Sequence, residues 1–314
     1  MVIKGLFFMM QYYFKTAREE EFQIIPQLKE GCWIHVDEAT PEDLHAIAQL
    51  LSIEYTDLQD CLDKYELPRI EKIQNTVLIF TRHPTEHETG LYSSTLTIIL
   101  TPHYVITISP HRNYLIRNFL IQKSKLSTLQ KSKFLIALLF KITQEFTAHI
   151  RRVRHNVLRQ DKEIISVESE DITALTKHEE VLNQYQSCLI PLRTVLEAIT
   201  SGRYTNLYEK DQDLLLDLLN AVKQSEDLCS ISLKSIRSLR DSYQIIFTNN
   251  VSKTIKLLTA LTILFSLPTM IASLYGMNVL LPFSASSDAF LYIIGITVVI
   301  MTGSIFIFHR KRWL

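Results

Sequence analysis

Apolar positions are densest in two uncharged runs near the C-terminal end of the chain. Residues 257–277 and 289–308 contain no Lys, Arg, Asp or Glu. Each run is long enough for a helix to cross about 30 Å of hydrocarbon. The pattern therefore predicts a first transmembrane helix over 257–277, an outer loop over 278–288 and a second transmembrane helix over 289–308.

Basic residues flank this pair of spans on one side only. Lys253 and Lys256 precede the first span, and the tail 309–314 contains Arg310, Lys311 and Arg312, whereas 278–288 has no Lys or Arg. Because positive flanks stay on the cytoplasmic side, we expect a multi-pass protein of the plasma (inner) membrane. Both termini would then be cytoplasmic.

Residues 1–120 alternate between strand-like and helix-like patterns. Residues 33–36 (WIHV) and 77–80 (VLIF) are typical of strands, and 96–100 with 104–108 predict a hairpin around Thr101-Pro102-His103. Thr40-Pro41-Glu42-Asp43 predicts a capped helix start with acids in the first turn. We expect a cytoplasmic domain in which helices pack on a sheet.

Residues 121–256 have a helical period. Apolar residues from Phe134 to Phe146 recur on one face, and a further helix from about Asp211 meets no Pro or Gly before Pro268. In that helix Ile236, Leu239, Tyr243, Ile246 and Asn250 step by 3 and 4 residues, which predicts a self-association seam. The expected fold class is an α+β cytoplasmic domain followed by a long stalk helix and two C-terminal transmembrane helices.

Hydroxyl side chains repeat along the first span. Ser252, Thr259, Thr262, Ser266, Thr269 and Ser273 are separated by 7, 3, 4, 3 and 4 residues, which places them on one helix face. Such hydroxyls can simply bond to the preceding turn of their own helix. Six in register favour a seam that meets water or other copies of the chain.

Composition and motifs exclude several classes of function. The net charge is zero, with 33 basic and 33 acidic residues, so no basic field indicates a nucleic-acid partner. Four cysteines without CxxC spacing are typical of free thiols. The chain has no nucleotide-binding loop and no recognisable catalytic constellation, so we expect no enzyme.

A group of histidines and acids could hold a metal ion. It comprises His83, His87, Glu86 and Glu88, although a solvated polar turn is the favoured interpretation.

The end of the first span resembles a known family. Tyr275-Gly276-Met277-Asn278, with Pro268-Thr269 before it and a basic tail ending Lys-Arg-Trp-Leu, is similar to the signature of the CorA-type magnesium and cobalt transporters. The stretches around Trp33, Asp57–Asp63 and Pro68–Glu71 also resemble the family's cytoplasmic domain.

This resemblance implies a homopentamer around a pore. It implies that Asn278, within the Tyr275–Asn278 signature, forms a ring at the outer mouth, with Thr262, Ser266 and Thr269 lining the pore below. Ile255 and Leu258 would form an apolar gate, although the family often has Met at the position of Ile255.

The resemblance also implies a cytoplasmic regulatory cation. Asp217 falls where the family's stalk carries an acid that shares a cation with a neighbouring subunit, and the partner would be Glu86 or Glu88. Asp217 is equally explained as a solvated helix acid. The outer loop is usually acidic in the family, whereas 279–288 has only Asp288, which leaves the preferred ion open.

The expected function is uptake of Mg²⁺, and also Co²⁺, through a homo-oligomeric channel driven by the membrane potential and gated by cytoplasmic cation. Mg²⁺ would be both the transported and the regulatory ion. Two alternatives remain. The cargo could be Zn²⁺ or another divalent metal, with proton coupling, or the spans could only anchor a signalling or scaffold domain that transports nothing.

Overall fold

The structure is a computed structural model that describes residues 10–85, 92–121, 125–160, 167–204, 209–279, 282 and 288–313. Its contacts divide the chain into two units. The first comprises residues 1–164 and 174–238, and the second comprises 165–173 and 239–314. The helix α5 contributes to both units, and each unit is described by itself.

The first unit is built on a seven-stranded mixed sheet. Its strand order is β2-β1-β3-β7-β6-β5-β4, in which only β3 and β7 run parallel among the described pairings. The strands are β1 (Met10–Phe14), β2 (Gln23–Ile24), β3 (Trp33–Val36), β4 (Arg69–Ile73), β5 (Thr76–Pro84), β6 (Ser93–Leu100) and β7 (Val105–Ile108). The helices of the chain are α1 (Pro41–Leu51), α2 (Tyr114–Ile121), α3 (Lys131–Gln160), α4 (Ser169–Thr200), α5 (Glu209–Tyr275) and α6 (Ala289–Arg310), with 3-10 turns at Tyr55–Asp57 and Gln59–Leu62.

Local sequence signals fix the first helix and the central hairpin. Thr40 caps α1 with its side chain accepting from the Asp43 backbone N–H, while the Asp43 carboxylate accepts from the Thr40 backbone N–H. This reciprocal capping box satisfies two amides that a helix start leaves unpaired. Between β6 and β7, the Thr101 hydroxyl accepts from the Tyr104 backbone N–H at 2.8 Å, which tightens the turn. The predicted capped helix and hairpin are therefore confirmed.

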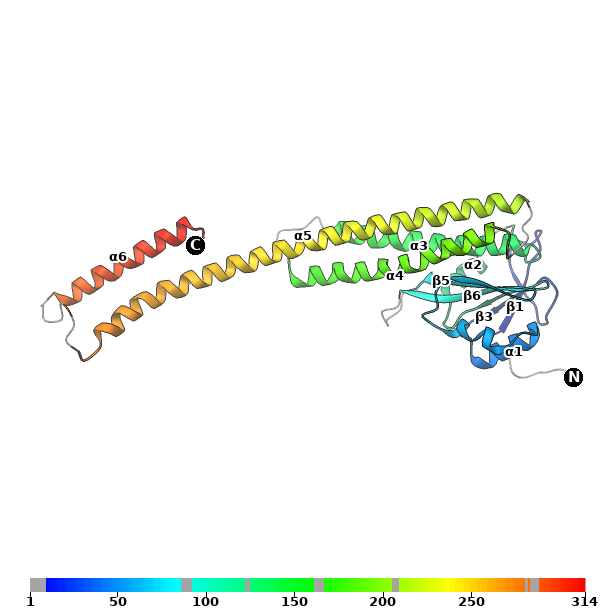
Figure 1. Cartoon of the computed structure of the whole chain (residues 1–314), viewed down its shortest axis with the longest axis horizontal. Coiled ribbons are helices and arrows are strands. Elements are labelled where there is room, and N and C mark those ends of the chain that lie inside the picture. The colour runs from blue at the N-terminus through cyan, green and yellow to red at the C-terminus, as the bar shows by residue number, and fades with distance from the viewer. Residues whose placement is uncertain are drawn as a thin grey trace. The chain divides into compact units, whose positions relative to one another are not determined.

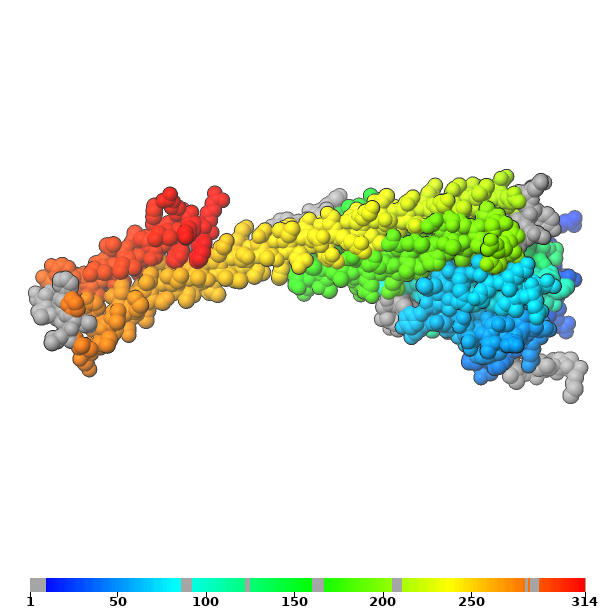
Figure 2. Space-filling model, in the orientation of Figure 1, coloured from blue at the N-terminus to red at the C-terminus, as the bar shows by residue number. Residues whose placement is uncertain are grey.

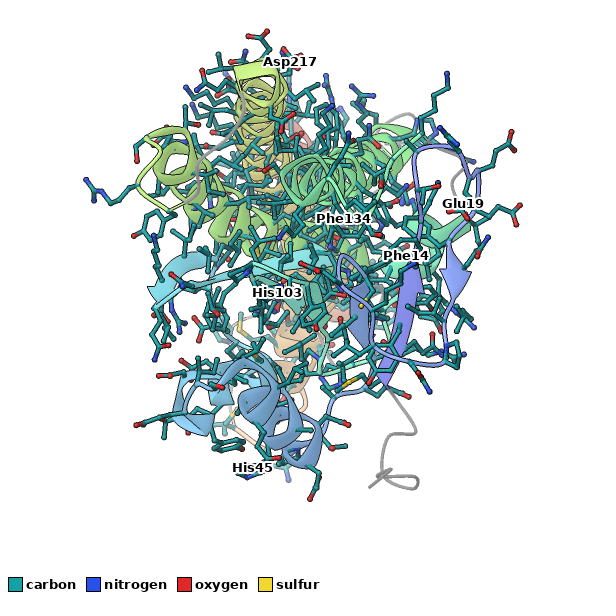
Figure 3. All side chains as sticks on the ribbon, turned by 90° about the vertical axis from the view of Figure 1, so that its right-hand side faces the viewer. Phe14, Glu19, His45, His103, Phe134 and Asp217 are labelled. Carbon is teal, nitrogen blue, oxygen red and sulfur yellow. The ribbon has the colours of Figure 1, made fainter. Side chains whose placement is uncertain are left out.

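Helices cover both faces of the sheet. Figures 1 and 3 show α1, which carries His45, on one face, and α3, α4 and the first part of α5 on the other. On the helical side, Trp33 of β3 packs against Phe119 and Phe134, with ring centroids 6.0 and 5.0 Å away. In Figure 2 the α4 side chains pack over the sheet without a visible gap. The apolar face predicted from Phe134 to Phe146 thus forms the layer between the sheet and α3.

A buried polar layer lies at the end of β5. The Arg82 guanidinium donates to the carbonyl oxygens of Lys64 and Glu66 and to Ser93 Oγ at 2.8–3.0 Å. The neighbouring His83 is 3% exposed, and its Nδ1 contacts the carbonyl of Pro84 at 3.0 Å. Burial lowers the pKa of His83 to about 4, with the adjacent Arg82 adding to the effect. The predicted solvated polar turn is therefore wrong at His83, because β5 extends into the sheet–helix interface.

The predicted self-association seam on α5 lies partly inside the chain. Ile236 and Tyr243 are only 2% and 4% exposed, and Leu239 and Ile246 are half-buried. The burial of Ile236 and Tyr243 records packing against the chain's own residues, so the expectation that this stripe faces other copies is wrong at these two positions. The four cysteines are free, as predicted, and all four are buried.

The second unit contains two helices that bury almost nothing within the chain. The apolar part of α5 and the whole of α6 are long and apolar enough to span a membrane. Within the chain, only 11% of the apolar stretch of α5 is buried, and none of the apolar stretch of α6 is. Large apolar side chains such as Phe265, Phe290 and Val299 are about 70% exposed. A helix that is apolar all round and unburied is typical of a membrane span.

Candidate ion-conducting surface

Hydroxyl groups in the membrane part of α5 bond to their own helix. Thr259 Oγ1 donates to the Ile255 carbonyl and Thr262 Oγ1 to the Leu258 carbonyl, both at 2.8 Å. Ser266 and Thr269 donate in the same way to Thr262 and Phe265. Each hydroxyl proton is thus directed at a carbonyl of the preceding turn, so the oxygen lone pairs are left to accept from, or coordinate, another group.

These oxygens share a narrow face. At 100° per residue, Thr262, Ser266, Thr269 and Ser273 fall within an arc of roughly 60° on α5. All four residues are exposed in the chain. The result is an uncharged row of oxygens, and neutral oxygens are suitable partners for a hydrated divalent cation.

Two apolar side chains precede this row on the same face. Ile255 and Leu258 lie one to two turns before Thr262 and fall within about 40° of it around the helix. They are 58% and 64% exposed. The face therefore changes from apolar to hydroxyl-bearing along α5, and apolar constrictions can close a pore by excluding water.

The signature residues lie at and just beyond the end of α5. Tyr275 is the last helical residue, and its hydroxyl donates to the Pro282 carbonyl at 3.4 Å. Gly276, Met277 and Asn278 follow in a turn, and all three are exposed. Asn278 therefore presents a neutral amide directly after the hydroxyl row, while Tyr275 ties the helix end to the following loop.

Gly276 does not act as a left-handed helix stop. Among the described glycines only Gly31 and Gly202 have positive φ angles. A methyl group at Gly276 would lie 3.4 Å from the Ala272 oxygen and 3.5 Å from the Ser273 oxygen, which is an ordinary contact. Gly276 therefore does not occupy the left-handed conformation, and nothing inside the chain requires glycine there.

Asp217 is exposed on the outer side of the first unit, where Figure 3 labels it. It lines a groove of about 700 Å³ whose apolar wall includes Phe119, Phe140 and Leu214. Three lysines, Lys125, Lys133 and Lys141, line the same groove. Lys141 is paired with Glu145 at 2.8 Å. This basic setting offers Asp217 cationic neighbours, so a metal ion there would need further acids from outside the groove.

The partner acids proposed for Asp217 cannot be placed. Glu86 and Glu88 lie outside the described residues. Across the described part of the chain, no three His, Cys, Asp or Glu side chains are grouped so that they could hold a metal ion. The regulatory site therefore remains a prediction.

Comparison with known proteins decides the family. Residues 29–310 match the model of the family described as CorA-like Mg²⁺ transporter protein. The chain belongs to this family. It is therefore a member of a family of transporters and not of enzymes.

Two relatives and a solved structure extend the match over nearly the whole chain. The cobalt/magnesium transport protein CorA of Methanocaldococcus jannaschii is 24% identical, over 90% of this chain and 91% of its own length. The cobalt/magnesium transport protein CorA of Thermotoga maritima is 22% identical, over 96% and 88%. The complete structure of the M. jannaschii CorA magnesium transporter superposes with a TM-score of 0.76 at 20% identity, covering 98% of this chain and 99% of that one. The predicted fold class is thereby confirmed.

The structure adds features that the sequence pattern did not reveal. The Tyr275–Pro282 hydrogen bond and the lysine-lined groove beside Asp217 join residues that no periodic pattern links. The hydrogen bonds from the α5 hydroxyls to carbonyls of their own helix are also visible only in the structure. Residue spacing predicts which helix face the hydroxyls share, but not where each O–H bond points. The capacity of Ser and Thr to bond to a carbonyl four residues back was the available signal.

Proposed function

We propose that this protein forms a homopentameric channel that carries Mg²⁺, and also Co²⁺, into the cytoplasm. The observation that carries the proposal is the exposed row of hydroxyl oxygens on α5, in a chain that matches the CorA-like family over residues 29–310. The relatives are named as cobalt/magnesium transport proteins.

In this proposal the chain spans the membrane twice. Residues 257–277 and 289–308 are the spans, 278–288 is the outer loop, and 1–120, 121–256 and 309–314 are cytoplasmic. The charge asymmetry of the flanking segments supports this orientation.

The α5 face would line the pore. Asn278, held by the Tyr275–Asn278 turn, would meet the hydrated ion at the outer mouth, and Thr269, Ser266 and Thr262 would offer oxygens below it. Mg²⁺ gives up its water reluctantly, so uncharged oxygens around a hydrated ion suit it better than a carboxylate cage. Ile255 and Leu258 would close the pore at the cytoplasmic end.

The membrane potential would supply the driving force. A divalent ion entering down an inside-negative potential of ~100 mV gains about 4.6 kcal/mol, at ~2.3 kcal/mol per charge. That free energy corresponds to an accumulation of about a thousandfold or more, so no nucleotide is required. Binding of Mg²⁺ at a cytoplasmic site that includes Asp217, with Glu86 or Glu88 of a neighbouring copy, would close the channel when the ion is abundant.

The test is Mg²⁺ entry into proteoliposomes that contain the full-length protein and an imposed inside-negative potential. We expect entry that rises with the potential and that Co²⁺ inhibits more effectively than Zn²⁺. Entry of Zn²⁺ in preference to Mg²⁺ would assign a different cargo. Vesicles that pass none of these ions would support an anchored domain without transport.

A further inference from the structure

We propose that the C-terminal tail, His309 to Trp313, is a binding site for the headgroup of an anionic phospholipid. The inference goes beyond ion conduction and rests on the proposed placement of α6 in the bilayer. It is carried by the folded shape of the tail, the position of its tryptophan and the run of basic residues before that tryptophan.

The tail does not simply continue away from α6. The Arg312 backbone N–H donates to the His309 carbonyl at 3.0 Å, and the Trp313 backbone N–H donates to the Phe308 carbonyl at 2.9 Å. Arg312 has a φ angle of 54°, in the left-handed region. These features form a Schellman motif, in which the chain turns back onto the last turn of its helix.

The turn brings two aromatic rings together. The Trp313 ring stacks on the Phe308 ring with centroids 5.6 Å apart and an angle of 12° between their planes. Phe308 is the last residue of the uncharged run 289–308, so the stack lies where that run meets the basic tail. Tryptophan is enriched at that depth because its ring is amphipathic.

Four basic residues lie between the two stacked rings in the sequence. His309, Arg310, Lys311 and Arg312 are all exposed. Glycine is the residue that a left-handed helix end favours, yet this position holds Arg312. A basic side chain, that of Arg312, thus stands at a position whose left-handed backbone conformation favours glycine.

The residues that flank this end of α6 in the sequence carry no acidic side chain. Between residues 242 and 313 the sequence has a single acidic residue, Asp288, at the opposite end of the helix. The 22 residues of α6 separate the two ends, a distance of about 33 Å. The carbonyl oxygens at the helix end attract cations, but they carry no full charge, whereas a lipid phosphate does. Cations just outside a span attract anionic lipids by roughly fivefold per charge.

Tryptophan fluorescence tests the proposal directly. The chain has two tryptophans, and Trp33 is fully buried in the first unit, so lipid-borne quenchers report on Trp313. The full-length protein is reconstituted in phosphatidylcholine vesicles that contain an equal fraction of either brominated phosphatidylglycerol or brominated phosphatidylcholine. We expect the anionic lipid to bind at least about fivefold more strongly at Trp313. The double variant Lys311→Gln/Arg312→Gln should have a clearly weaker preference, because only Arg310 remains of the three Lys and Arg side chains of the tail.

A matched double variant separates a tail site from general surface charge. Lys253→Gln/Lys256→Gln removes two cations before the first span and should leave the preference at Trp313 unchanged, and Trp313→Phe should remove the quenched signal. Equal quenching by both lipids in the unaltered protein, or equal loss in the two double variants, would overturn the proposal. So would competition by soluble glycerol phosphate, which would assign a site for free phosphate. Mg²⁺ entry measured in the same vesicles distinguishes failure of the lipid site from failure of the proposed transport.

Discussion

The helices of the two units contain similar apolar residues but bury them differently. In α3, Phe134, Leu138 and Phe146 are fully buried against the rest of the first unit. In α6, no residue is buried, although its mean hydropathy is higher. Apolar surface that the chain does not cover must be covered by lipid or by other copies. Burial within the chain thus distinguishes a helix that belongs to a hydrophobic core from one whose apolar surface is left to lipid. Composition alone distinguishes the two less clearly.

Polar groups follow the same division. In the first unit the charged Arg82 is satisfied by specific carbonyl and hydroxyl acceptors from two separate segments. In α5 each seam hydroxyl is satisfied by its own helix, and its oxygen remains exposed. The first arrangement fixes a fold, whereas the second keeps a surface available for ions or for neighbouring copies.

The largest effect is expected at Asn278. Asn278→Ala should reduce Mg²⁺ uptake by about tenfold to a hundredfold, because losing one hydrogen bond to a charged species costs about 1.5–3 kcal/mol and each 1.4 kcal/mol is tenfold. Uptake into proteoliposomes measures this. Asn249→Ala, an exposed amide earlier in α5, is the control. Near-normal uptake by an assembled Asn278→Ala protein would contradict the assignment.

A smaller effect is expected at the apolar end of the α5 face. Leu258→Ser should increase the leak of the closed channel by about tenfold, equivalent to about 1.4 kcal/mol, because a wetted constriction no longer excludes ions. Single-channel recording at high internal Mg²⁺ measures this leak. The adjacent Leu257, 44% exposed on a different side of α5, gives the control Leu257→Ser, and the same leak in both variants would mean that the face has no gating role.

Asp217 tests whether the first unit senses the ion. Asp217→Ala should raise the internal Mg²⁺ concentration that closes the channel by about fivefold or more, the usual lower range of coupling between sites. Patch-clamp titration of internal Mg²⁺ gives this concentration. Asp227→Ala removes an exposed acid from the same helix and serves as the control. If both variant channels close at the internal Mg²⁺ concentration that closes the unaltered channel, Asp217 has no sensing role and only balances the charge of the lysines in its groove.

A separate effect, on stability and not on transport, is expected at His83. Burial lowers its pKa in the folded state to about 4, from an ordinary value of 6.5. The unfolded chain therefore binds more protons between these values, and stability falls as the pH drops from 6.5 towards 4, by about 2–3 kcal/mol for this residue. His83→Asn should flatten that part of the dependence of Tm on pH in detergent. His103→Asn, at an exposed histidine, should leave the slope unchanged, and a slope that His83→Asn does not alter would assign the acid sensitivity to other groups.

Elements whose signals are local were predictable. The strand over Trp33–Val36, the capped helix after Thr40 and the hairpin around Pro102 depend on neighbouring residues, and the structure has all three. The α5 seam was misassigned at Ile236 and Tyr243, because a 3–4 spacing reports an apolar face without saying what covers it. The same limit applied to His83, whose burial depends on α3 packing against β5.

The sequence by itself determined the family resemblance, the two uncharged runs and the hydroxyl spacing, because each depends only on residue type and helical period. Tertiary structure decided which apolar stripe of α5 is covered within the chain, that Asp217 lies among lysines, and that Trp313 folds back onto Phe308. These features join residues far apart in the chain or depend on backbone angles. Such contacts arise from packing between elements, and the periodicity of a single helix carries no information about its neighbours.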